Sequence, residues 1–242
     1  MGRASGGIDG LEMAMAGRRG DLRRHRGAGR PGPGTDSAAG GGRYVVAYIE
    51  VNPTAAADGS RLVRQFRDLS RTERGNLRAE ALQRIGLSHQ FALVNVWADQ
   101  DAAEAHATAA GSVQFRDRLK AMENAPIDER VHSPLSVGPL TAGAKGSVIA
   151  VVTHVDVIPP QRDSASAMLK QLTEDSRKDD GNLRFEALTQ VNRQNHFTLI
   201  EMWRNRRAAD AHAMAAHTRA FREKLLPASG ALYDERFYLL MN

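Results

Sequence analysis

The chain contains no cysteine, few aromatic residues and no long apolar run. Without cysteine it can form no disulfide, no thiolate metal site and no cysteine nucleophile. No apolar stretch approaches the ~20 residues that a transmembrane helix needs, and the start of the chain lacks the apolar core of a secretory signal. These absences favour an unexported protein without membrane contact, and we expect it in the cytoplasm.

The net charge of +5 is concentrated in the first 43 residues, which hold eight arginines against four acidic residues. That segment has no Phe, Tyr or Trp on which a base could stack, so we expect no nucleic-acid partner. Gly27 to Gly32 matches a GxGxxG dinucleotide pattern, but no strand precedes it and a proline interrupts it. Residues 1–42 are therefore predicted to be a disordered Gly/Arg-rich extension.

From residue 43 onward the sequence repeats itself without a gap at an offset of 106 residues. Gly75–Arg78 returns as Gly181–Arg184, and Trp97 returns as Trp203. A repeat of about ninety residues is too long for a solenoid unit and indicates a duplicated small domain. The repeat predicts an N-terminal domain over 43–132, a Pro/Gly/Ala-rich linker over 133–146 and a C-terminal domain over 147–242.

The second copy shows the element pattern of the repeat most clearly. Apolar residues at helical spacing between Ala165 and Leu172 indicate a first helix. Gly181 follows this helix, and we expect it to cap the helix in a left-handed conformation. The ranges predicted as strands are 148–157, 183–189, 196–203 and 232–240, with a second helix over 208–226. The order β-α-β-β-α-β defines an α+β, ferredoxin-like fold. Because one such sheet leaves an apolar face bare, the two copies should pack together as an intrachain pseudo-dimer.

Candidate functional residues gather near the end of the second copy. Glu201 and Trp203 are two apart on a strand and so share one face. His212, on the following helix, can fold back over that face and form a pocket between sheet and helix. His217 lies five residues further, about 140° around a single helix, which is a poor metal spacing. His154 and Asp156 share a strand face, but two ligands do not make a metal site. We therefore predict no metal.

These residues resemble the antibiotic-biosynthesis monooxygenase family, including its quinol monooxygenase branch. In the first copy Trp97 and His106 fit the family pattern, whereas Asn95 and Gly111 replace an acid and a histidine. The positions of the second copy that carry the resemblance are Pro159, Gly181, Phe185, Glu201, Trp203, Ala211, His212 and His217.

The resemblance implies a dimeric α/β-barrel, here formed within one chain. It also implies oxidation of a quinol, phenol or anthrone by O2 without flavin, haem or metal, so that the expected partners are a small aromatic substrate and oxygen. A quinol can serve as its own reductant once deprotonated, and an imidazole is a suitable base near neutral pH.

The predicted catalytic residues are His212 as general base, Glu201 to steady the imidazole, Trp203, and His106 as the copy of His212. Glu201 is expected to meet His212, Arg184 or Arg222 because an unpaired buried carboxylate is costly. The residues predicted to bind the substrate are Phe185, Arg184, His217, His154, Trp97 and Asn95.

Other functions remain open at this point. A haem-degrading enzyme of the same fold would use an asparagine, a tryptophan and a histidine, whereas the first strand of the second copy offers His154, and Tyr48 stands in the first strand of the first copy. A catalytically silent small-molecule-binding or scaffold protein, an isomerase or a lyase would also fit. The pseudo-dimer could associate into a larger homo-oligomer.

Overall fold

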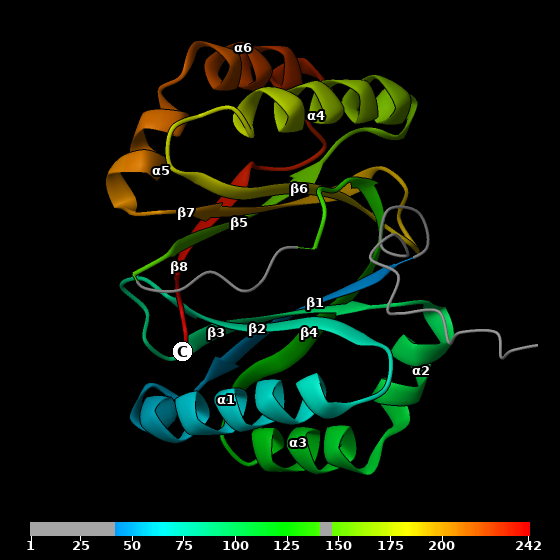
Figure 1. The fold of residues 1–242 in the computed structure, drawn as a ribbon, viewed down its shortest axis with the longest axis vertical. Helices are drawn as coiled ribbons and strands as arrows, with labels where there is room; N and C mark the ends of the chain where they lie inside the picture. Colours follow the sequence, from blue (N-terminus) through cyan, green and yellow to red (C-terminus); the bar gives the residue numbers. More distant parts are fainter. Residues whose placement is uncertain (1–41, 141–146) are drawn as a thin grey trace, which may run out of the picture. The chain divides into compact units, whose positions relative to one another are not determined.

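The computed structural model describes residues 42–140 and 147–242, which form eight strands and the helices that cover them (Figure 1). The elements of the N-terminal half are β1 (Arg43–Val51), α1 (Ala56–Thr72), β2 (Asn76–Arg84), β3 (Gln90–Trp97), α2 (Gln100–Thr108), α3 (Ala110–Lys120) and β4 (Glu123–Ser136). Those of the C-terminal half are β5 (Ile149–Asp156), α4 (Arg162–Ser176), β6 (Asn182–Gln190), β7 (His196–Trp203), α5 (Arg206–Ala213), α6 (Ala216–Leu225) and β8 (Asp234–Leu240).

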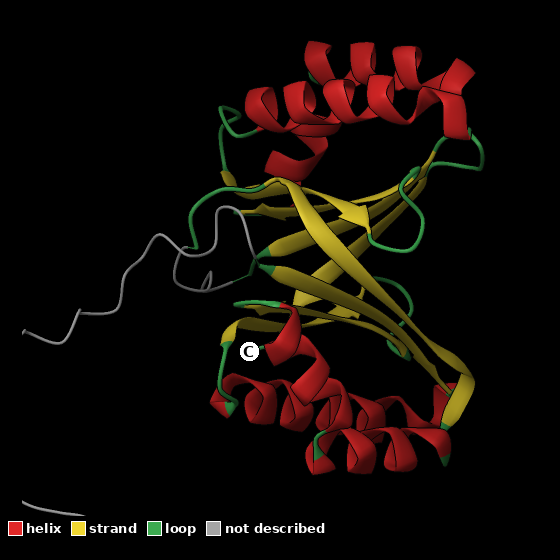
Figure 2. Cartoon of the chain, turned by 90° about the vertical axis from the view of Figure 1, so that its right-hand side faces the viewer, coloured by secondary structure: helices red, strands yellow, loops and turns green. Residues whose placement is uncertain are grey.

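The eight strands form one closed antiparallel barrel in the order β1-β3-β2-β8-β5-β7-β6-β4. Each half contributes a four-stranded sheet, and the halves join where β8 pairs with β2 and β4 pairs with β6. The helices of each half cover the outer face of its own sheet, so the strands lie between two helical layers (Figures 1 and 2). The predicted α+β fold and the intrachain pseudo-dimer are therefore confirmed.

The strands are buried on both faces, and alternate side chains enter different cores. On β5, Val151 and Val155 pack beneath the helices together with Trp203. Val152 points the other way, into the barrel interior beside Tyr44. Because the side-chain period of a strand is two, every strand residue is committed to one of these environments. This alternation decides which candidate residues can share a site.

The barrel interior contains a buried ion-pair network built from residues that repeat at the offset of 106. Arg78 donates to Glu186 (2.6 Å), and Arg184 donates to both carboxylate oxygens of Glu80 (2.9 and 2.5 Å). The Tyr44 hydroxyl lies 3.3 Å from Glu186. These pairs cross from one half to the other, so each half supplies the charges that neutralise its copy.

Several boundaries differ from the sequence-based expectation. The helix predicted over 208–226 is two helices, because Ala215 takes an extended conformation (φ −62°, ψ 148°) between α5 and α6. The same break separates α2 from α3 in the first half. Strand β4 continues to Ser136 and pairs with β6, so the first part of the predicted linker is strand. The predicted disorder of residues 1–42 and the rest of the linker fall mostly outside the described residues.

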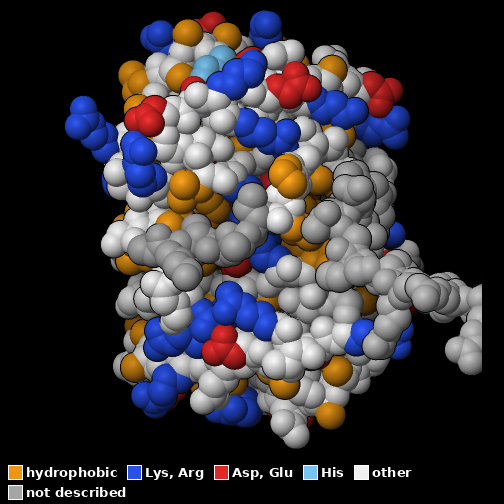
Figure 3. Space-filling model, in the orientation of Figure 1, with side chains coloured by type: hydrophobic (Ala, Val, Ile, Leu, Met, Phe, Trp, Pro, Cys, Tyr) orange, Lys and Arg blue, Asp and Glu red, His pale blue; other side chains and the backbone are white. Residues whose placement is uncertain are grey.

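None of the described helices is long and apolar enough to cross a membrane. On the face drawn in Figure 3, Lys and Arg side chains are scattered over both helical layers and are interrupted by Asp and Glu.

Candidate functional site

The imidazole of His212 lies in the last turn of α5 and faces the outer surface of the C-terminal sheet. Trp203, at the end of β7, stacks on it with ring centroids 4.7 Å apart and an interplanar angle of 26°. Phe185 on β6 meets the imidazole edge-on at 5.4 Å. His212 is only 6% exposed, whereas Trp203 and Phe185 are fully buried. The two aromatic rings therefore pack against His212 from the side of the sheet and hold its ring in place.

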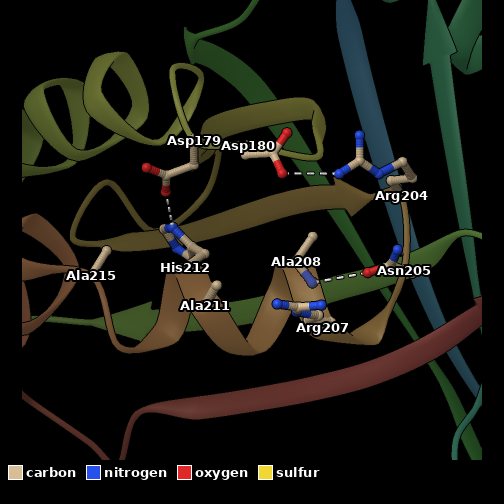
Figure 4. Close-up of a pocket in the computed structure, with 9 residues that line it drawn as sticks. All are labelled: Asp179, Asp180, Arg204, Asn205, Arg207, Ala208, Ala211, His212 and Ala215. Atoms are coloured by element: carbon tan, nitrogen blue, oxygen red, sulfur yellow. Dashed lines mark hydrogen bonds and ion pairs between the residues drawn. The ribbon is translucent and has the colours of Figure 1, made fainter.

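Asp179 fixes the orientation of His212. Its Oδ2 lies 2.7 Å from His212 Nδ1 (Figure 4). An ionised carboxylate can only accept a hydrogen bond, so Nδ1 carries the proton and the free lone pair is on Nε2. Burial lowers the pKa of His212, and the hydrogen bond to Asp179 acts in the opposite direction. Hence the imidazole is neutral at neutral pH and can accept a proton.

The turn that carries Asp179 is held against α5 by a glycine. Gly181 has φ +81°, in the left-handed region that favours glycine. A Cβ at this position would lie 2.6 Å from the Cβ of Ala208, so any larger residue would push the turn away from the helix. The left-handed conformation predicted for Gly181 is confirmed, and it sets the distance between Asp179 and His212.

Glu201 lies beneath His212 on β7 and is 3% exposed. Its Oε2 accepts a hydrogen bond from Trp203 Nε1 (2.8 Å) and is 3.9 Å from His212 Nε2. Burial raises the pKa of Glu201 to about 8, so this carboxyl group is protonated at neutral pH. Of the three partners expected for Glu201, only His212 lies within 4 Å, whereas Arg184 and Arg222 do not. The carboxylate that holds the imidazole is therefore that of Asp179 rather than Glu201.

A pocket of about 500 Å³ opens beside His212 between the turn before β6 and the start of α5. One wall is a row of alanines, and charged and amide side chains stand opposite. Arg204 donates to Asp180 (3.0 Å), and the Asn205 side chain caps α5 through the Ala208 amide (Figure 4). The residues that line the pocket are Asp179, Asp180, Arg204, Asn205, Arg207, Ala208, Ala211, His212 and Ala215.

A second hollow of about 340 Å³ lies between α4 and α6, on the other side of His217. Its floor includes the core residues Leu172 and Phe221. His217 Nε2 lies 3.2 Å from Asp179 Oδ2, so His217 and His212 both approach the same carboxylate oxygen. His217 thus stands between the two hollows.

Two residues predicted to bind the substrate lie on the opposite face of the sheet. Arg184 is adjacent to Phe185 on β6 and therefore points into the barrel, where it pairs with Glu80. His154 shares the inward face of β5 with Val152, and its Nε2 lies 3.2 Å from His196 Nδ1. Neither side chain can contact a molecule bound beside His212, which corrects their predicted grouping.

The N-terminal half repeats part of this arrangement. His106 Nδ1 lies 2.8 Å from Glu73 Oε2, and the Trp97 ring is 4.5 Å from the imidazole. Asn95 takes the place of Glu201. The Phe66 ring packs 5.3 Å from His106, where the second half has Leu172. The histidine–acid pair is therefore present twice, but its surroundings differ.

Asp179 was missed from the sequence, although the repeat holds the signal that could have found it. The residue 106 positions earlier is Glu73, so an acid stands at this place in both copies. Thr218 and Ser112 likewise place a hydroxyl near the histidine in each half, with oxygen to Nδ1 distances of 3.4 Å.

The fold and site together define a tandem ferredoxin-like protein in which two halves close one barrel and a histidine–carboxylate pair lies between sheet and helices. The family model for antibiotic biosynthesis monooxygenase matches residues 43–118 and 148–224. The chain therefore belongs to this family, once in each half.

Individual relatives agree with this assignment. The Bacillus subtilis protein named "Putative monooxygenase YcnE" is 26% identical over 74 residues, which are 31% of this chain and 78% of the relative. A crystal structure of a "putative monooxygenase" from Fusobacterium nucleatum superposes with a TM-score of 0.75 at 15% identity, covering 84% of this chain and 94% of that one. A structure described as an anthrone oxidase-like protein superposes with a TM-score of 0.65 at 12% identity, covering 85% of this chain and 93% of that one. At such identities these two structures establish the fold alone.

Proposed function

We propose that this protein is a monooxygenase that oxidises a small electron-rich phenol, quinol or anthrone with O2, with His212 as the general base in the C-terminal half. The observation that carries the proposal is the hydrogen bond between Asp179 and His212 at the wall of a 500 Å³ pocket. A neutral imidazole held at Nδ1 by a carboxylate is suited to accept a proton at Nε2. Because Nε2 lies 3.9 Å from the buried Glu201, the reacting hydroxyl or C–H group must reach in from the pocket past the edge of the ring.

The chemistry needs few protein groups. Removal of the proton gives an electron-rich anion that can pass an electron to oxygen. One oxygen atom then bonds to a ring carbon, and the other leaves as water with the two electrons and two protons that the substrate supplies. The imidazolium of His212 can return its proton to the departing oxygen.

The pocket offers groups that would favour this path. The wall formed by Ala208, Ala211 and Ala215 can take the flat face of a ring. Arg204, which pairs with Asp180 across the pocket, and Arg207, next to Ala208 on α5, would stabilise the negative charge that develops on the substrate oxygen (Figure 4). The protonated Glu201 adds no negative charge beneath the imidazole. Trp203 and Phe185 are assigned the task of holding His212, since neither lines the pocket.

The relatives support the same class of reaction. The family name and the names of the Bacillus and Fusobacterium proteins refer to monooxygenases, and one structural neighbour is described as anthrone oxidase-like. We extend this activity to the present chain because His212 and the pocket lie within the matched region 148–224.

Oxygen uptake with a panel of quinols and anthrones, in the presence of chelator, tests the proposal. His212→Gln keeps a polar side chain of similar length, and we expect it to lower the rate by about 100-fold or more, as loss of a general base does. His106→Gln tests the copy in the N-terminal half, and it should keep the rate within about threefold if the reaction takes place beside His212 alone. Circular dichroism and thermal unfolding establish that both variants fold.

A His212→Gln variant that folds and consumes oxygen at the wild-type rate would remove His212 from the mechanism. A wild-type protein that binds the aromatic compounds but consumes no oxygen with any of them would favour the non-catalytic binding protein instead.

A further inference from the structure

Three side chains of types that can bind a metal converge beside the C-terminal pocket. Asp179, His212 and His217 each offer one donor atom, and the three atoms lie within 4.8 Å of one another. We propose that these residues bind a divalent transition-metal ion of the zinc class, and that the bound ion inhibits the reaction by occupying the proton-accepting imidazole. The binding part stands alone, whereas the inhibition rests on the proposed function.

The distances suit a tetrahedral ion. Bonds of about 2.0 Å from zinc to nitrogen and oxygen place neighbouring ligand atoms about 3.3 Å apart. Asp179 Oδ2 is 3.2 Å from His217 Nε2 and 2.7 Å from His212 Nδ1. The donor atoms of His212 and His217 lie up to 4.8 Å apart, so the two imidazoles must turn toward each other to bond one ion. Two imidazoles and a carboxylate also form a donor set that zinc prefers.

The break between α5 and α6 makes this arrangement possible. On one continuous helix, residues five apart point about 140° away from each other. Here the extended conformation of Ala215 interrupts the helix, and His217 turns back toward Asp179. The spacing argument against a metal assumed a single helix and does not apply.

His217 Nε2 is available to a ligand. This atom is buried, and among the residues that the structure describes it makes no hydrogen bond of acceptable angle, although Asp179 Oδ2 is close. A bound ion would satisfy its lone pair. Buried polar atoms are otherwise paired in most proteins.

The surroundings fit an ion with one open position. Asp179 and His212 line the 500 Å³ pocket, so an ion can enter from solvent and keep water as its fourth ligand. When Nδ1 of His212 binds the ion, the proton of this ring moves to Nε2. That nitrogen faces Glu201 Oε2 at 3.9 Å, where metal-bound histidines commonly have a carboxyl partner.

The N-terminal half lacks the third ligand and serves as an internal control. His106 and Glu73 pair as their copies do, but Gly111 stands where His217 does. A Cβ at Gly111 would clash with the Cδ2 of Leu69, so a larger side chain there would require Leu69 to move. Two ligands do not hold an ion firmly, and we expect one site per chain.

Metal binding is measured on the untagged full-length protein, with Co2+ as a spectroscopic probe and Zn2+ by calorimetry. We expect tetrahedral Co2+ absorption that saturates at one equivalent and is displaced by one equivalent of Zn2+. His217→Ala, which removes the ligand that the first half lacks, should weaken Zn2+ binding by about 100-fold or more. His196→Gln, which alters the other close histidine pair, should bind Zn2+ like the wild type.

The proposal is overturned if the wild type shows no such absorption, or if His217→Ala binds Zn2+ as tightly as the wild type does. Oxygen uptake separates the second part: Zn2+ should inhibit the wild type, chelator should reverse the inhibition, and His217→Ala should resist it relative to its own metal-free rate. A protein that binds Zn2+ but never consumes oxygen contradicts the proposed function and leaves the metal site standing.

Discussion

The two halves of the barrel share a frame but differ in what surrounds the histidine–acid pair. In both, a tryptophan at the end of the third strand packs its ring against the histidine, and a left-handed glycine brings the acidic turn against the helix. Around the pair, Phe185, Glu201 and His217 of the C-terminal half correspond to Ala79, Asn95 and Gly111 of the N-terminal half.

Most of these differences replace a polar group by an apolar or smaller one in the first half. Phe66 there stacks on Phe115 with centroids 3.9 Å apart and reaches His106. Leu69 fills the space above Gly111. The comparison teaches that the histidine–acid pair is part of the frame of each half, and that the additional polar groups distinguish the C-terminal site. Substitutions in the shared frame should therefore lower the stability of both halves to a similar extent. Substitutions of the polar groups around His212 should have effects that their counterparts in the N-terminal half do not have.

The largest expected effect lies in the barrel interior, where the halves are alike. Glu186→Gln removes the 2.6 Å partner of Arg78, which keeps Glu80 at 3.8 Å. Glu80→Gln removes the bidentate partner of Arg184, which keeps Glu186 at 3.4 Å. Breaking a buried ion pair costs about 3–5 kcal/mol when the remaining charge is unpaired, and we expect a loss of unfolding free energy up to that size here. Urea unfolding should give similar losses for both variants. A loss confined to one of them would show that the network is not shared equally.

The second expected effect is a gain in stability from Glu201→Gln, which concerns the C-terminal half alone. The pKa of Glu201 rises to about 8 from an unfolded value of 4.5. Between these values the unfolded chain releases a proton that the folded protein keeps, so stability is full below pH 4.5 and is lost as pH rises toward 8. Glu201→Gln does not titrate and should be about 3 kcal/mol more stable than wild type at pH 7.

Urea unfolding at pH 4 and pH 7 measures this difference. The advantage of the Gln variant should largely vanish at pH 4, where the wild-type carboxyl is protonated in both states. Equal stability of the two proteins at both pH values would show that Glu201 is not held neutral. Asn95 already places an uncharged amide in the first half, so Asn95→Gln is a control without such pH dependence.

The smallest effect compares the two glycines of the frame. Gly181→Ala and Gly75→Ala both introduce a Cβ at positive φ that lies 2.6 Å from an alanine of the facing helix. Each should lower the unfolding free energy by about 1–3 kcal/mol. Only Gly181→Ala should also slow oxygen uptake, because it displaces the turn that carries Asp179. Equal loss of activity in both variants would place the reaction in both halves.

Much of the fold could be predicted from the residues. The repeat at 106 residues indicated the duplication, and the alternation of strand and helix patterns indicated the element order of each copy. The bare apolar face of each sheet then required a partner, which the second copy supplies. In the second copy, strand ends were predicted within two residues. In the first copy, β4 runs past the predicted domain end at 132, because its last residues pair with β6.

The site was predicted less completely. The meeting of His212 with Trp203 follows from strand period and helix position. Asp179 lies in a turn, where no periodicity indicates direction, and its role depends on the close contact of Gly181 with Ala208. The grouping of Arg184 with Phe185 failed because adjacent strand residues face opposite sides, one toward the helices and one into the barrel.

By itself, the sequence determined the duplication, the element order and the residue types available for chemistry, because these depend on local pattern and composition. The tertiary structure alone decided which of those residues meet. It turned His217 back toward Asp179 at a helix break, placed Arg184 and His154 on the inner face, and brought a second histidine to the histidine–acid pair in only one of the two copies. Such meetings depend on contacts between segments far apart in the chain, and no local pattern encodes them.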